Sequence, residues 1–147
     1  MPLDSSFVGR TYPPTPPYEV GREKIREFAT AVGATHAAHR DPDAARTLGH
    51  PDLVAPPTFP IVLTMAASDQ IIHDPALGID YSRVVHGDQR FSYARPVHAG
   101  DLLRTTATIE EITHRAGSGF ITTRFDVRDA AGEPVVTARS MLVVRGV

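Results

Sequence analysis

The sequence predicts an α+β fold in which one apolar helix is covered by a run of antiparallel strands. Residues 61–72 are hydrophobic nearly all round, which is typical of a helix buried by other elements. From residue 81 onward, segments rich in Val, Ile, Thr and aromatic residues follow one another. Short connections between long strands favour antiparallel pairing, so the sheet must wrap or cover the helix.

The N-terminal part predicts an extended segment followed by an amphipathic helix. Tyr12–Pro17 (YPPTPP) should run extended along a surface, because proline favours the polyproline conformation. Residues 21–32 carry apolar side chains at helical spacing on one side and charged ones on the other. Gly33 suits the C-cap of this helix.

A second, shorter helix is predicted over residues 42–48. Asp41 is its expected N-cap, and Gly49 is expected to end it. The apolar helix begins between Pro57 and Ile61, since proline is tolerated in a first turn.

Four strands are predicted in the C-terminal part, separated by turns rich in Gly, Asp and Ala. The length of 147 residues fits one domain, which we expect to span residues 1–147. The predicted strands are Val84–Tyr93, Leu102–Thr113, Phe120–Asp129 and Val135–Val144.

Composition excludes several functions. The net charge is −2, and Lys24 is the only lysine among 15 basic residues that are scattered along the chain, so no nucleic-acid footprint is visible. The absence of cysteine excludes thiolate metal sites, cysteine nucleophiles and disulfides. No apolar stretch is long enough for a membrane span and no secretory signal is visible, so we expect a cytoplasmic protein.

The segment Val85–Asp101 (VHGDQRFSYARPVHAGD) resembles the MaoC-like dehydratase family, in which a central strand ends in an Arg-Pro-Val-x-x-Gly-Asp turn. Val8-Gly9-Arg10, the helix at 21–32 and Val54–Phe59 are similar to the N-terminal-domain branch of this family. That branch includes non-catalytic subunits of mycobacterial-type (3R)-hydroxyacyl-carrier-protein dehydratases. The resemblance implies a hot-dog fold, a long helix wrapped by a curved antiparallel sheet, usually dimeric.

Members of this family that hydrate enoyl thioesters resemble one another in a Gly-Asp-x-Asn-Pro-x-His segment, whose Asp and His form a catalytic dyad. The corresponding segment here is Gly33–His39 (GATHAAH). His39 matches the catalytic His, but Ala34 stands at the Asp position and His36 at the Asn position. A methyl group cannot accept a proton or orient water, so half of the dyad is absent.

Two further departures lie at the start of the apolar helix. Related fatty-acid dehydratases carry a Glu on this helix, and Val62 stands at that position. In this family, donors at the helix start polarise the thioester carbonyl. Pro57 replaces the donor glycine and has no N–H, which leaves Thr58 as the nearest backbone donor.

His39 admits three interpretations. In the first interpretation, His39 is a general base with an acid recruited from Asp41, Asp52 or Asp88, since imidazole readily transfers protons near neutrality. In the second, His39 is a metal ligand together with His36 and Asp41, although the spacing matches no strong motif and we expect no metal. The third interpretation is a loop histidine with a packing or hydrogen-bonding role.

His86 and Asp88 lie on the strand expected beside the apolar helix. In the structural interpretation, the two side chains stabilise the sheet across a dimer. In the functional interpretation, they contact the thioester or its pantetheine arm. Asp69, late in the apolar helix, resembles in position the carboxylate of hot-dog thioesterases.

The sequence thus favours a subunit of a (3R)-hydroxyacyl-thioester dehydratase or enoyl hydratase that binds an acyl-coenzyme A or acyl-carrier-protein thioester, needs no cofactor, and obtains the dyad from a partner chain. The alternatives are a self-sufficient homodimer that uses His39, an acyl-thioester binding protein without turnover, and a thioesterase that uses Asp69. The expected substrate-binding residues are Thr58, Phe59, Val62, Met65, His86 and Asp88, with Ile61 and Ala66 along the same apolar groove.

Overall fold

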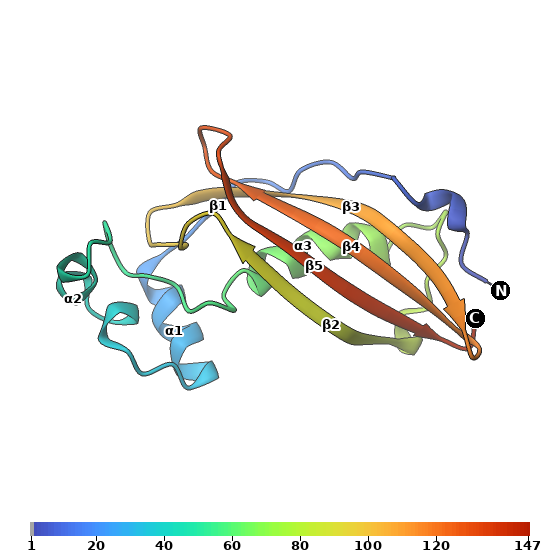
Figure 1. Cartoon of the computed structure of the whole chain (residues 1–147), viewed down its shortest axis with the longest axis horizontal. Coiled ribbons are helices and arrows are strands. Elements are labelled where there is room, and N and C mark those ends of the chain that lie inside the picture. Colours follow the sequence, from blue (N-terminus) through green and yellow to red (C-terminus); the bar gives the residue numbers. More distant parts are fainter. Residues whose placement is uncertain (1) are drawn as a thin grey trace.

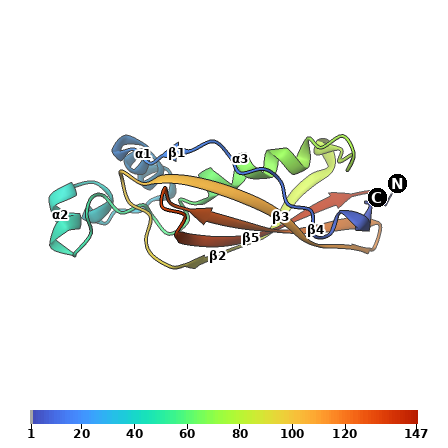
Figure 2. The same cartoon turned by 90° about the horizontal axis from the view of Figure 1, so that it is seen from above.

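The structure, a computed structural model, describes residues 2–147. A five-stranded sheet curls around helix α3 (Ile61–Ile72), and the smaller helices α1 and α2 lie together at one end (Figures 1 and 2). The two chain termini lie near each other at the opposite end (Figure 1). The α+β prediction is therefore confirmed.

The sheet is antiparallel throughout, in the order β1-β3-β4-β5-β2. The four long strands match the predicted segments to within about two residues at each end, because alternate side chains must face the helix. The short strand β1 was not predicted from the sequence. The bounds are β1 (Tyr18–Glu19), β2 (Val84–Tyr93), β3 (Leu102–Arg115), β4 (Ser118–Arg128) and β5 (Pro134–Arg145).

Helix α3 packs only one of its faces against the sheet. Leu63, Ala67 and Ile71 are buried there, whereas Met65 is 63% exposed and Ala66 is exposed as well. The prediction of a helix buried by other elements therefore holds for this face and fails for Met65, Ala66 and Asp69, which are exposed. Two of these three side chains are apolar.

The helices at one end form a small lobe before α3. Helix α1 (Arg22–Val32) ends at Gly33, whose φ of 73° is the left-handed conformation expected of a glycine C-cap. A 3₁₀ turn (Ala37–His39) leads to α2 (Pro42–Thr47), and the Asp41 carboxylate accepts a backbone N–H in the first turn. Both predicted helices and both predicted caps are confirmed.

The proline-rich segment Tyr12–Pro17 runs extended along the β3 edge of the sheet, as predicted (Figure 1). The Tyr12 N–H donates to the Ala107 carbonyl, and the Thr15 N–H donates to the Thr105 carbonyl, each at 2.9 Å. The segment therefore occupies backbone groups of β3 that would otherwise be open.

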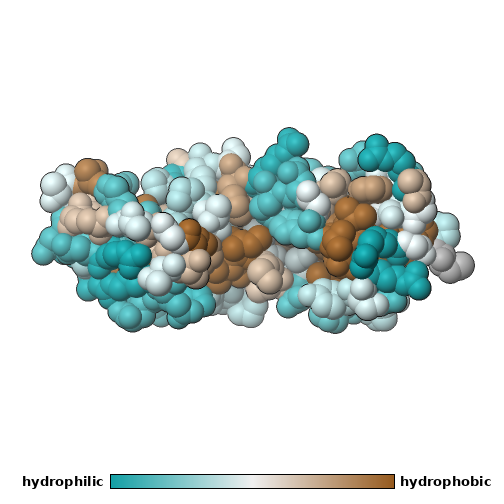
Figure 3. All heavy atoms as spheres, turned by 90° about the horizontal axis from the view of Figure 1, so that it is seen from below, coloured by the Kyte–Doolittle hydropathy of each residue, from teal (hydrophilic) through white to brown (hydrophobic). Residues whose placement is uncertain are grey.

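The other edge of the sheet is β2, which pairs only with β5. Figure 3 views the molecule from the side on which β2 lies, and two hydrophobic patches occupy the middle of this face. Exposed apolar side chains near this edge include Val85 on β2 and Tyr81 in the 3₁₀ turn (Tyr81–Arg83) before it, at 41% and 66% exposure. Among residues 2–147, no helix combines the length and the apolarity needed to cross a membrane.

Candidate functional site

The Arg-Pro-Val-x-x-Gly-Asp turn after β2 is closed by an ion pair between its first and last residues. The Arg95 guanidinium donates two hydrogen bonds to the Asp101 carboxylate, both at 2.9 Å. Asp101 is only 6% exposed and also accepts the N–H of His98 at 3.0 Å. Gly100, at φ 94°, allows the chain to reverse inside this clasp. The motif is thus an architectural clasp, consistent with its turn chemistry.

This turn holds the loop that leads into α3. The Ala55 N–H donates to the Val97 carbonyl at 2.8 Å, the Ala99 N–H donates to the Leu53 carbonyl at 2.9 Å, and Val54 forms a β-bridge with His98. The Val54 carbonyl, fixed in this way, faces the lobe that carries His39.

His39 is half-buried, and its Nδ1 lies 2.6 Å from the Val54 carbonyl oxygen. A carbonyl oxygen can only accept, so Nδ1 carries the proton and Nε2 is left as the basic nitrogen. In an Asp/His dyad a carboxylate would stand beside this ring, and here Ala34 occupies the matching sequence position.

The three acids considered as partners of His39 are all engaged elsewhere. Asp41 caps α2. Asp52 accepts two hydrogen bonds from Arg22, at 3.0 and 2.8 Å. Asp88 accepts from Arg90 on its own strand at 3.1 Å. Within residues 2–147, no carboxylate is hydrogen-bonded to His39.

The ion pair of Asp52 predicts a specific pH dependence of stability. Hydrogen bonds from Arg22 lower the pKa of Asp52 to about 2, below its ordinary value of 3.8. A carboxyl whose pKa is depressed by folding stabilises the protein above its unfolded pKa, and this contribution is lost as the pH falls toward 2. Because the pair lies near solvent, we expect about 1 kcal/mol at neutral pH.

Urea unfolding of the wild type and of Asp52→Asn between pH 6 and pH 2 measures this contribution. The two proteins should differ most at pH 6 and converge as the pH falls through about 4 to 2. A difference that stays constant over this range would show that the Asp52 charge does not stabilise the fold.

His36 does not join His39 in a metal site. The Nδ1 atom of His36 accepts the Ala38 N–H at 3.0 Å, and the His36 and His39 rings meet edge to face with centroids 6.1 Å apart. Asp41, the third proposed ligand, is the cap of α2. No group of three or more potential metal ligands exists in the part of the chain that the structure describes.

The start of α3 retains one free backbone donor. The N–H groups of Phe59 and Ile61 donate to the carbonyls of Pro56 and Thr58, and Pro57 and Pro60 have no N–H. The Thr58 N–H has no acceptor within residues 2–147, and this residue is exposed. Thr58 is therefore the donor that remains at this helix end, in agreement with the sequence.

A groove of about 220 Å³ lies between α3 and the adjoining strands. Helix α3 forms one wall, and β2, β4, β5 and Tyr81 form the other. Its walls combine apolar and polar side chains, as in many sites that bind small molecules. The lining residues are Ile61, Thr64, Met65, Ser68, Asp69, Ile72, Tyr81, Val84, His86, Gln89, Phe125, Ser140 and Leu142.

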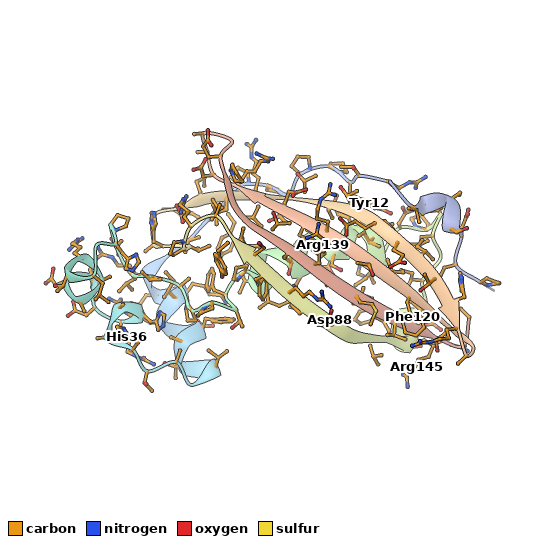
Figure 4. The ribbon with its side chains drawn as sticks, viewed as in Figure 1. Tyr12, His36, Asp88, Phe120, Arg139 and Arg145 are labelled. Atoms are coloured by element: carbon orange, nitrogen blue, oxygen red, sulfur yellow. The ribbon has the colours of Figure 1, made fainter. Side chains whose placement is uncertain are left out.

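The structure separates His86 from Asp88, which the sequence had suggested as one site. A bulge at Gly87 shifts the register, so that His86 pairs with Leu142 on the inner face and Asp88 pairs with Met141 on the outer face. His86 therefore lines the groove, whereas Asp88 lies on the face that points away from α3 (Figure 4). The assignment of Asp88 to the substrate site is not supported by this geometry.

Of the remaining predicted residues, Ile61 and Met65 line the groove, whereas Thr58, Phe59, Val62 and Ala66 do not. Phe59 is fully buried and meets Phe28 edge to face at 5.4 Å. Val62 packs against the same core cluster. Phe59 is thus a core residue, which an apolar sequence segment alone cannot distinguish from a groove residue.

Sequence reasoning missed Gln89, whose side chain enters the groove on the inner face of β2. The signal for it was Gly87, because a glycine inside a strand often marks a bulge.

The candidate residues therefore occupy two places. His39 and its loop belong to the lobe at one end, where Figure 4 labels His36, and the groove runs along α3 beneath β2, where Asp88 is labelled on the opposite face. His39 is not among the residues that line the groove.

Comparison with known families assigns the chain to one of them. The family described as FAS1-like, dehydratase domain region, matches residues 6–138. The chain belongs to this family. It is a MaoC-like hot-dog protein, and the fold expected from the resemblance is thereby confirmed.

Relatives of the same length support this membership. A UPF0336 protein of Streptomyces griseus is 62% identical over 99% of this chain and 97% of its own length. A UPF0336 protein of Saccharopolyspora erythraea is 58% identical over 99% of this chain and 94% of its own length.

Solved structures of MaoC-like dehydratases share the fold. One MaoC-like dehydratase superimposes with a TM-score of 0.88 at 36% identity, over 95% of this chain, which spans only 42% of that protein. A chain of the C-terminally truncated HadBC (3R-hydroxyacyl-ACP dehydratase) complex of Mycobacterium tuberculosis gives 0.85 at 34% identity, over 96% of this chain and 99% of that one. The ChsH1-ChsH2 complex of the same organism, at 21% identity and a TM-score of 0.71, shares the fold.

Proposed function

We propose that this MaoC-like chain is a subunit of a (3R)-hydroxyacyl-thioester dehydratase or enoyl-thioester hydratase. It binds the acyl chain of a coenzyme A or carrier-protein thioester and relies on a second MaoC-like chain for the Asp/His dyad. The observation that carries the proposal is His39, whose ring is hydrogen-bonded to the Val54 carbonyl and to no carboxylate within residues 2–147. The setting implied is fatty-acid metabolism in the cytoplasm.

The chemistry explains why a lone imidazole is insufficient. Adding water across an enoyl bond requires a base at the attacking oxygen and an acid at the carbon that becomes protonated. Nε2 of His39 can serve one of these steps. Ala34 cannot serve the other, and Asp52 is held as a carboxylate by Arg22. The reaction itself requires neither a metal nor a redox cofactor.

The open surface of the chain supports a role beside a partner. The uncovered face of α3, with Met65 and Ala66, adjoins β2, whose outer edge offers free backbone groups. Apolar surface of this kind next to an open strand is typical of an interface between subunits. The HadBC structure, similar at 34% identity, is a complex of dehydratase chains.

A hydration assay tests the proposal. The full chain is purified alone and after co-expression with a MaoC-like chain that carries the complete dyad, and hydration of a short enoyl-coenzyme A is followed. We expect activity only in the mixture, with a native mass that shows one copy of each chain. Strong activity of this chain alone, or the absence of a mixed complex, would contradict the subunit role.

One observation favours a second candidate, a homodimer that catalyses hydration by itself. The Val54 carbonyl accepts from Nδ1 of His39, so in the neutral imidazole Nε2 is the nitrogen that can take up a proton, as a general base must. In that case the chain alone hydrates enoyl-coenzyme A, and His39→Ala removes this activity.

A thioesterase is the weaker third candidate, because Asp69 lines the groove from α3. Release of free thiol from acyl-coenzyme A by the chain alone, and loss of that release in Asp69→Asn, would support it.

A further inference from the structure

The groove contains an amide whose hydrogen-bonding capacity is unused. Both Nε2 and Oε1 of Gln89 are buried, and neither has a partner within residues 2–147. A buried polar group left unpaired costs about 1–3 kcal/mol. Gln89 lines the groove, so a molecule bound there can restore both hydrogen bonds.

The register of β2 directs this amide inward. In a regular strand with no bulge, alternation from His86 would place Asp88 on the inner face and Gln89 on the outer face. The bulge reverses this order and sets Gln89 opposite Ser140 of β5. A side chain at Gly87 would meet Met141 Cε at 2.8 Å, so glycine suits the bulge.

Gln89 shares the groove with two further polar side chains that are little exposed, Ser140, its cross-strand partner, and Thr64 of α3. Ser140 is 7% exposed and Thr64 is 2% exposed, and both line the groove. Within residues 2–147 the Thr64 hydroxyl has one hydrogen bond, which it donates to the Ile61 carbonyl at a long 3.4 Å. Apolar side chains, including Phe125 and Leu142, form most of the remaining wall. A plain hydrocarbon chain would match these walls but leave the Gln89 amide unpaired.

We propose that Gln89 recognises a hydroxyl group carried by the acyl chain in the groove, and thereby selects hydroxyacyl over saturated thioesters. This inference rests on the proposed function, since it assumes that the groove holds an acyl thioester. A hydroxyl oxygen accepts from Nε2–H while its own proton is donated to Oε1. A carbonyl satisfies only the Nε2–H group, and a methylene satisfies neither. Gln89 is in this sense a specificity residue.

Calorimetric binding to the full chain, alone and in the mixed complex, tests this selection. The probes are octanoyl-coenzyme A and three hydroxyoctanoyl-coenzyme A thioesters with the hydroxyl at carbon 3, 5 or 7. We expect at least one hydroxylated probe to bind about tenfold more tightly than octanoyl-coenzyme A, the ratio that corresponds to one well-made hydrogen bond. The position that binds best then reports how far Gln89 lies from the thioester.

The decisive variant is Gln89→Leu, which keeps the approximate volume and removes the amide. The preference for the hydroxylated probe should fall to less than about twofold, while octanoyl-coenzyme A binds as tightly as before or more tightly. Gln70→Leu is the matched control, because Gln70 donates to the Pro13 carbonyl outside the groove. It should keep the full preference.

The outcomes separate this inference from the proposed function. Binding of all four probes without a preference, or a preference that survives Gln89→Leu, overturns the role of Gln89 and leaves the subunit role standing. Dissociation of the mixed complex by Gln89→Leu with an unchanged preference shows that the partner chain satisfies the amide, and also overturns it. Failure of every thioester to bind overturns both proposals.

Discussion

In the mixed complex, replacing the dyad histidine of the partner chain by Ala should lower kcat for enoyl-thioester hydration by about 10³-fold, within the range lost with a general acid–base group. His39→Ala in this chain should change kcat by less than about threefold, because no carboxylate within residues 2–147 is hydrogen-bonded to His39 to complete a dyad. Steady-state kinetics on the two singly substituted complexes measure both effects.

Restoring the missing carboxylate provides a control for this prediction. Ala34→Asp places an acid at the position where the family carries one, and His36→Asn can be combined with it. If His39 is inactive only for lack of this partner, the double variant should gain activity without help from a second chain. A loss of about 10³-fold on His39→Ala in the mixed complex would instead make His39 the working base.

Asp101→Ala should lower the free energy of unfolding by about 2 kcal/mol, because it removes the buried carboxylate of a partly buried ion pair. The substitution leaves the Arg95 guanidinium without its bidentate acceptor and the His98 N–H without its carboxylate. Urea unfolding monitored by circular dichroism measures the change. Asp101→Asn, which keeps an oxygen acceptor, should lose less and serves where the Ala variant does not fold.

Asp88→Ala is the matched control for Asp101. Its ion pair with Arg90 lies on the exposed outer face of the sheet, so its loss should cost less than about 0.5 kcal/mol. Equal effects of the two substitutions would show that the clasp does not anchor the turn. The clasp should also matter beyond stability, because the turn it closes holds Val54 and, through its carbonyl, the ring of His39.

The regular elements of this fold could be predicted because their signals are local. Alternating side chains define the long strands, and a glycine at φ 73° ends α1 where the sequence places Gly33. The Arg95–Asp101 turn and the donor at Thr58 were expected from the resemblance to the MaoC-like family, and the structure shows both.

The predictions that failed concern features that depend on contacts between residues far apart in the sequence. The strand and the family resemblance suggested both His86 and Asp88, but the bulge at Gly87 puts these two on opposite faces and turns Gln89 inward. An apolar residue looks the same in sequence whether it enters the core, as Phe59 does, or lies open on α3, as Met65 does. Hydrophobicity predicts that a surface is covered, but not which chain covers it.

The proline-rich stretch Tyr12–Pro17 limits how these molecules can associate. By occupying backbone groups beside β3, it leaves β2 as the side on which another strand can be added. A sheet with a single open edge can pair with only one other such sheet. Association through the strands therefore ends at a pair and does not continue into an open-ended fibre. Loss of this stretch would expose the β3 edge as well. Each chain could then pair through both edges of its sheet, and the chains could polymerise.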